Sequence, residues 1–109
     1  MQIYMFPHYV SITSSRSLSE HLFSFLASQG VELEGARWNG DLDSLPTTPS
    51  IIRASSMMEC GWGELGKKCA ELGHFCFYND AVVLADGNRS RELLIDEANK
   101  FLAKQVATA

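Results

Sequence analysis

The chain has no surplus and no cluster of basic residues. Nine Lys and Arg residues are scattered along it against thirteen Asp and Glu residues, which leaves a net charge of −4. Nonspecific binding to nucleic acid or to an anionic membrane surface requires clustered cations that neutralise phosphates. We therefore expect neither a nucleic-acid partner nor a membrane partner.

Long apolar runs are also missing. No segment approaches the roughly 18 consecutive apolar residues of a membrane-spanning helix. The N-terminal residues lack the basic-then-apolar order of a signal peptide. These features predict a cytoplasmic location.

Paired cysteine motifs are absent as well. The three cysteines, Cys60, Cys69 and Cys76, cannot all pair within one chain, and none belongs to a C-x-x-C motif. Their spacing, even with His74, differs from that of zinc sites, whose paired ligands lie two to four residues apart. We predict reduced thiols that pack as small apolar side chains, and no metal or other cofactor.

A cysteine-dependent enzyme is an alternative interpretation. Cys60 lies near a predicted helix N-terminus, a position that lowers the pKa of a thiol. No local signature joins this cysteine to a histidine, as nucleophilic catalysis requires. The sequence therefore favours a protein without catalytic residues.

What the chain does contain is the composition of one ordinary globular domain. Hydrophobic residues make up 46% and charged residues 20% of its 109 residues, and no repeat or linker divides it. Strand and helix patterns alternate, which predicts an α+β (α/β) domain over residues 1–109. We expect a mixed sheet of about five strands with three helices, in the order strand, helix, strand, strand, helix, strand, strand, helix. The expected strands span 2–6, 31–38, 50–54, 74–78 and 81–85, and the expected helices span 17–29, 56–72 and 89–106.

The first three strands carry specific expectations. The run 2–6 is apolar on both faces and ends at Pro7, so we place it centrally in the sheet. The run 31–38 has solvent-side glutamates and a change of apolar phase at Gly35, which predicts an edge strand with a β-bulge. We expect it to form a hairpin with 50–54.

The second helix is rich in glycine. Gly61, Gly63 and Gly66 interrupt its apolar stripe, and each costs roughly 1 kcal/mol relative to alanine in a helix interior. We expect irregular first turns, or a place where another backbone approaches closely.

The segment 74–85 predicts a β-hairpin with a two-residue turn at Asn79-Asp80. Both of its faces are apolar, whereas a hairpin with one solvated face alternates apolar and polar residues. Either a helix or a partner must therefore cover the second side. Whether the three helices cover one face of the sheet or both is left open.

A serine-rich segment, Ser11–Ser19, lies between the first strand and the first helix. Unpaired N–H groups at a helix N-terminus attract anions, so Ser14, Ser15, Arg16 and Ser17 are candidate ligand-binding residues. With Ser15-Arg16 and Ser19, the segment resembles the phosphate-binding loop of flavodoxin-like FMN reductases. The resemblance covers nine residues, without the glycine expected in such a turn, and it does not assign the chain to that family. The alternative is that Ser17 caps the helix with Glu20.

Two functions follow from these features. The first is a protein-interaction module without catalytic activity, either a homodimer or an inhibitor or immunity-type partner. Its interaction surface would include Cys76, Tyr78 and Val83 of the hairpin, and Trp38. The second is a binding protein for a small anionic ligand, such as a nucleotide or a flavin phosphate, at the serine-rich segment. We take the first as the prediction and the second as the alternative.

Overall fold

A computed structural model describes residues 2–4, 8–11, 20–30, 34–37, 40–54, 60–104 and 106–108. Its α-helices are α1 (Glu20–Ser28), α2 (Trp62–Leu72) and α3 (Leu94–Lys104), and a short 3-10 helix is η1 (Leu42–Ser44). Its strands are β1 (Gln2–Tyr4), β2 (His8–Ser11), β3 (Glu34–Arg37), β4 (Ser50–Arg53), β5 (Phe75–Tyr78), β6 (Ala81–Val83), β7 (Arg89–Ser90) and β8 (Val106–Thr108).

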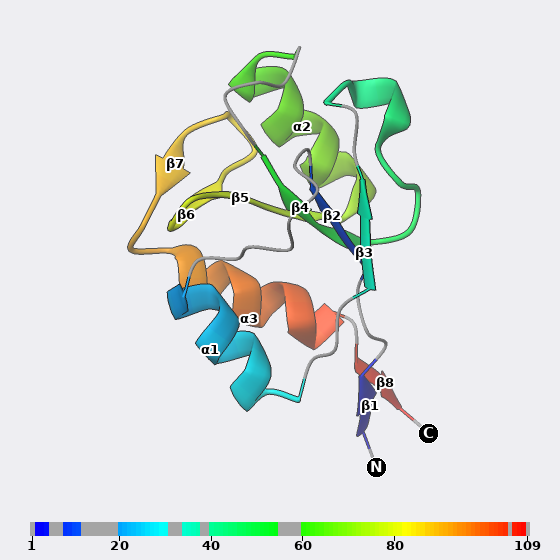
Figure 1. The fold of residues 1–109 in the computed structure, drawn as a ribbon, viewed down its shortest axis with the longest axis vertical. Helices are drawn as coiled ribbons and strands as arrows, with labels where there is room; N and C mark the ends of the chain where they lie inside the picture. The colour runs from blue at the N-terminus through cyan, green and yellow to red at the C-terminus, as the bar shows by residue number, and fades with distance from the viewer. Residues whose placement is uncertain are drawn as a thin grey trace.

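The main sheet is mixed and has the strand order β3-β2-β4-β5-β6-β7. Strands β3, β2, β4 and β5 run parallel, and β6 and β7 are antiparallel to their neighbours. A separate antiparallel pair, β1 and β8, brings the two ends of the chain together (Figure 1). The domain is thus an α+β fold with a mixed sheet, and its described residues form three α-helices.

The prediction for the first strand was wrong. The strand inside the main sheet is β2, which begins after Pro7, while β1 pairs with β8 outside that sheet. Two short apolar runs, 2–6 and 8–11, follow each other in the sequence. Local pattern does not say which of them pairs with the other strands, because that choice depends on long-range contacts.

The predicted hairpin between the second and third strands was also wrong. Strands β3 and β4 both pair with β2 in parallel, one on each side of it. Parallel strands need a connection of about a dozen residues, and the segment from Arg37 to Ser50 is long enough to cross β2. Strand β3 does lie at the edge of the sheet, as expected, but its register continues through Gly35 without a bulge.

The helices divide between the two faces of the sheet (Figure 1). Helices α1 and α3 cover one face, and α2 covers the other together with the loop around η1. The apolar cluster on the first face is made by Leu22, Leu26, Ile51, Phe75, Phe77, Val82, Leu94, Ala98, Phe101 and Leu102. The cluster on the second face is made by Leu45, Ile52, Ala54, Leu65, Cys69, Cys76 and Val83. The protein is therefore a three-layer structure.

The hairpin of β5 and β6 forms as its sequence predicts. Phe77 pairs with Val82 and Tyr78 with Ala81, which leaves a two-residue turn. Asn79 in that turn has a φ of 52°, a left-handed conformation that asparagine tolerates better than most residues. Both faces of the hairpin are apolar because α1 and α3 lie over one face and α2 lies over the other.

Helix α2 begins at Trp62, later than the predicted start at residue 56, and residues 55–59 lie outside the described residues. The helix ends at Leu72, and the left-handed conformation of Gly73, with a φ of 75°, lets the N–H of His74 reach the carbonyl of Cys69. A Cβ on Gly66 would collide with the carbonyl oxygen of Leu84. The predicted close backbone approach is thus confirmed, and it joins α2 to the turn after β6.

Helix α3 is shorter at its start than predicted. Its first predicted residues, Arg89 and Ser90, instead form β7 and pair with β6. The apolar residues of α3 that recur with the period of a helix are buried: Leu94, Ala98, Phe101 and Leu102 are at most 6% exposed. Within the described residues, no helix combines the length and apolar character needed to span a bilayer.

His74 ties the start of β5 to the loop before β4. Its Nδ1 accepts a hydrogen bond from the Ser50 N–H at 3.0 Å, and its Nε2 lies 2.8 Å from the carbonyl oxygen of Pro46. These partners require a neutral ring with its proton on Nε2. Burial lowers the pKa of His74 below its ordinary value of 6.5, although the bond to Pro46 opposes the shift.

Acidification is therefore expected to destabilise the fold through His74. The unfolded chain takes up this proton near pH 6.5, whereas the folded chain takes it up only at lower pH. The stabilisation is present above pH 6.5 and is lost as the pH falls toward the pKa of the folded protein. Urea unfolding of the wild type and of His74→Gln at pH 7.5 and 5.5 measures it, because glutamine does not titrate. Equal losses in both proteins between the two pH values would exclude His74 as the cause.

Candidate functional site at the carboxyl edge of the sheet

The sheet has a point of divergence between β2 and β4. After β2 the chain continues to α1 on one face, and after β4 it continues to α2 on the opposite face. In α/β sheets this divergence opens a crevice at the carboxyl ends of the two strands, and ligands commonly bind there. The carboxyl edge is therefore the first place to look for a site.

Three polar residues form a row at this edge. Ser11, the last residue of β2, is in register with Arg37 of β3 on one side and with Arg53 of β4 on the other. Neighbouring strands lie about 4.8 Å apart, so the backbones of the two arginines are separated by roughly 10 Å with Ser11 between them. We call Arg37, Ser11 and Arg53 the arginine row.

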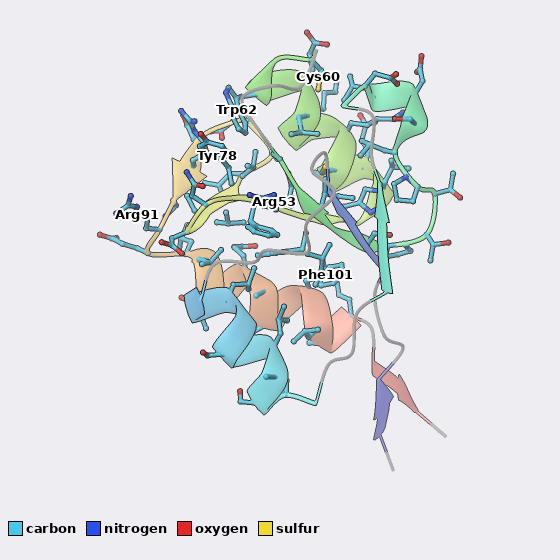
Figure 2. All side chains as sticks on the ribbon, viewed as in Figure 1. Arg53, Cys60, Trp62, Tyr78, Arg91 and Phe101 are labelled. Carbon is cyan, nitrogen blue, oxygen red and sulfur yellow. The ribbon has the colours of Figure 1, made fainter. Side chains whose placement is uncertain are left out.

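Arg53 is half-buried at the end of β4 (Figure 2). Ile51 belongs to the cluster under α1 and α3, so the alternation of side chains along β4 places Arg53 on that face. Its neighbours in register are Ser11 of β2 and Phe77 of β5. A guanidinium offers a planar fork of donors that suits phosphate or carboxylate.

Helix α1 connects the carboxyl end of β2 to the amino end of the parallel strand β3, so it runs roughly antiparallel to both. It packs against α3 on the first face of the sheet.

The predicted ligand-binding residues Ser14, Ser15, Arg16 and Ser17 lie outside the described residues. They remain predicted site residues, in the segment that connects Ser11 to Glu20. Sequence reasoning missed Arg37 and Arg53. Each is a single arginine at the end of a short strand, and nothing local shows that both strands pair with β2.

The predicted interaction surface is largely interior. Cys76 and Val83 are only 2% and 7% exposed, because they pack beneath α2 with Leu65 and Cys69. The helix, and not a partner, covers this side of the hairpin. Trp38 lies outside the described residues.

Among the described members of that predicted surface, Tyr78 is the one that is partly exposed. The centre of its ring lies 5.1 Å from the centre of the Trp62 ring in an edge-on arrangement, and Figure 2 labels both residues. The guanidinium of Arg89 stacks on Trp62 at 4.6 Å from the ring centre. This cation–π contact stabilises the packing of β7 against the start of α2.

The surroundings of Cys60 and Cys76 disfavour the thiolate form. Burial raises the pKa of Cys60, and its Sγ lies 3.7 Å from the carbonyl oxygen of Gly40. The lowered pKa expected near a helix N-terminus was therefore wrong for this thiol. A hydrogen bond to Cys69, together with burial, raises the pKa of Cys76 well above its ordinary value. The described residues contain no group of three or more His, Cys, Asp or Glu side chains placed to hold a metal ion.

Comparisons of the chain with models of known protein families, with curated proteins and with solved structures find no match. The functional argument therefore starts from the geometry of the carboxyl edge.

Proposed function

We propose that the protein binds a small phosphate-bearing anion at the carboxyl edge of the sheet, between β2 and β4. The observation that supports this proposal is the arginine row at the point of divergence. An anion seated at Ser11 has an arginine on each side of it. A guanidinium can donate paired hydrogen bonds to such an anion.

The chain around the row suits the same ligand. Ser14, Ser15, Arg16 and Ser17 follow β2 in the sequence and precede α1, so they would add hydroxyl groups and a third guanidinium. The protein as a whole carries a net charge of −4. Arg37 and Arg53, in register on either side of Ser11, are thus two positive charges on neighbouring strands of an otherwise acidic chain.

The interaction-module hypothesis stays a prediction, and its original basis has changed. Helix α2 occupies the side of the hairpin where a partner was expected. Among the residues that the structure describes, Leu93, at 39%, is the one large apolar side chain that is exposed. The described residues thus form no apolar patch that would support an interaction role. The arginine row gives the anion-binding role better support.

Thermal shift with phosphate, pyrophosphate, nucleotides and FMN, followed by calorimetric titration of the best ligand, tests the proposal. We expect at least one ligand to raise the melting temperature, because a ligand at 100 times its Kd stabilises a protein by about 2.7 kcal/mol. Arg53→Gln and Arg37→Gln should each weaken binding about tenfold or more, since a hydrogen bond to a charged group contributes roughly 1.5–3 kcal/mol.

Arg91→Gln is the matched control. Arg91 is an exposed arginine in the turn before α3, outside the row, so its replacement removes the same charge from a different place. Binding should be unchanged in this variant. The proposal fails if none of the anions binds, or if all three arginine variants lose the same modest amount of affinity, which would indicate a diffuse electrostatic effect.

A further inference from the structure

A cavity lies at the opposite edge of the sheet, where β5 and β6 separate. The paired residues of the hairpin are those nearest its turn, with Phe77 opposite Val82. Farther from the turn, the N–H of His74 bonds to the carbonyl of Cys69, and the N–H of Leu84 bonds to the carbonyl of Asn88. The two chains therefore diverge, and a cavity of about 560 Å³ remains between α2 and α3. This volume is within the usual range of roughly 300–1,000 Å³ for small-molecule sites.

Apolar side chains line the inner part of the cavity, and small side chains line its walls. Phe75, Val82 and Phe101 line the cavity on the face that carries α3 and are 4%, 3% and 6% exposed. Ala70 of α2 and Ala103 of α3 line the walls, and both are exposed residues. An extended apolar group fits this lining better than a polar one, because buried polar groups need hydrogen-bond partners.

The charged residues that line the cavity are two lysines, Lys100 and Lys104, and one carboxylate, Glu97, all on α3. Lys100 and Lys104 lie on successive turns of α3 and both line the cavity. Lys100 forms an exposed pair with Glu97 at 3.4 Å, an interaction of the weak surface kind. Among the described residues, no carboxylate forms an ion pair with Lys104. An apolar interior with cations at its opening is complementary to an amphipathic anion.

We propose that this cavity binds a free amphipathic carboxylate with an unbranched alkyl chain, of the medium-chain fatty-acid class. The alkyl chain lies on Phe75, Val82 and Phe101, and the carboxylate lies at Lys104 and Lys100. A cationic amphiphile of the same length should bind more weakly, because its charge would lie next to the two lysines, which carry the same charge. The inference does not depend on the anion site at the carboxyl edge, which uses other residues.

Amide NMR titration with hexanoate, octanoate and decanoate, each below its micellar concentration, tests the proposal. We expect shifts concentrated at the cavity, at residues such as His74 and Ala85. Affinity should rise about fourfold for each added methylene, the change that corresponds to about 0.8 kcal/mol. Octanol should bind more weakly than octanoate, and octyltrimethylammonium more weakly still.

Variants at the walls and mouth separate this site from nonspecific binding. Ala103→Trp, and independently Ala70→Trp, should abolish the octanoate shifts, and far-UV circular dichroism verifies that each exposed substitution leaves the fold intact. Lys104→Gln should bring octanoate affinity down toward that of octanol, while Lys67→Gln, on α2 outside the cavity, should not change it. The proposal is overturned if octanoate causes no shifts, if both folded tryptophan variants bind like wild type, or if octyltrimethylammonium binds as well as octanoate.

Discussion

Gly66→Ala is expected to destabilise the protein by about 3 kcal/mol. The added Cβ would collide with the carbonyl oxygen of Leu84 and lie 3.0 Å from the backbone nitrogen of Gly87. Both contacts are with backbone atoms, so no flexible side chain can move aside. Helix α2 must shift away from the turn between β6 and β7, and overpacking of this kind costs about 1–3 kcal/mol or more. Urea unfolding measures the loss.

Gly63→Ala is the matched control, on the same helix and one turn earlier. The nearest atom to its added Cβ would be the carbonyl oxygen of Asp86, at 3.8 Å, which is an ordinary contact. Alanine is favoured over glycine in a helix by roughly 1 kcal/mol. This variant should therefore be as stable as the wild type or more stable. If Gly66→Ala also unfolds at the wild-type urea concentration, the close approach of α2 to Leu84 is not a constraint on the fold.

Leu94→Ala is expected to cost about 2–5 kcal/mol, the usual range for removing a fully buried leucine side chain. Leu94 is the first residue of α3 and is 0% exposed. It belongs to the cluster between the sheet and helices α1 and α3, so its loss leaves a cavity where three elements meet. The free energy of unfolding in urea, measured with an unchanged m-value, reports the effect.

The adjacent leucine provides the control. Leu93 is 39% exposed, and its N–H bonds to the Ser90 hydroxyl at 3.2 Å through the backbone, which alanine retains. Leu93→Ala should change the stability by less than about 0.5 kcal/mol, as most surface substitutions do. Similar losses for the two neighbours would contradict the burial of α3 on this face.

Local features of the fold were predictable from the sequence. The stripe of Leu94, Ala98, Phe101 and Leu102 has the period of a helix, and the structure buries those residues. The turn at Asn79-Asp80 and the close approach at Gly66 were predicted from the residue types alone. Each of these signals is contained in a few neighbouring residues, so no knowledge of distant partners is needed.

The candidate site was only partly predictable. The serine-rich segment 11–19 attracted attention through its composition, and Ser11 is its first residue. No sequence pattern around Arg37 or Arg53 indicates a site. They become part of the candidate site only because β3 and β4 both pair with β2. Cys76 and Val83 were assigned to a surface because the sequence does not say whether a helix or a partner covers the hairpin.

The sequence by itself determined the kinds of elements, the hairpin turn, the buried faces of the helices and the net negative charge. Only the tertiary structure decided that β2 and not β1 enters the main sheet, that α2 lies opposite α1 and α3, and that two arginines flank Ser11. The physical reason is the range of the interactions. Helix periodicity and turn chemistry act between near neighbours, whereas parallel strand pairing joins residues far apart in the chain.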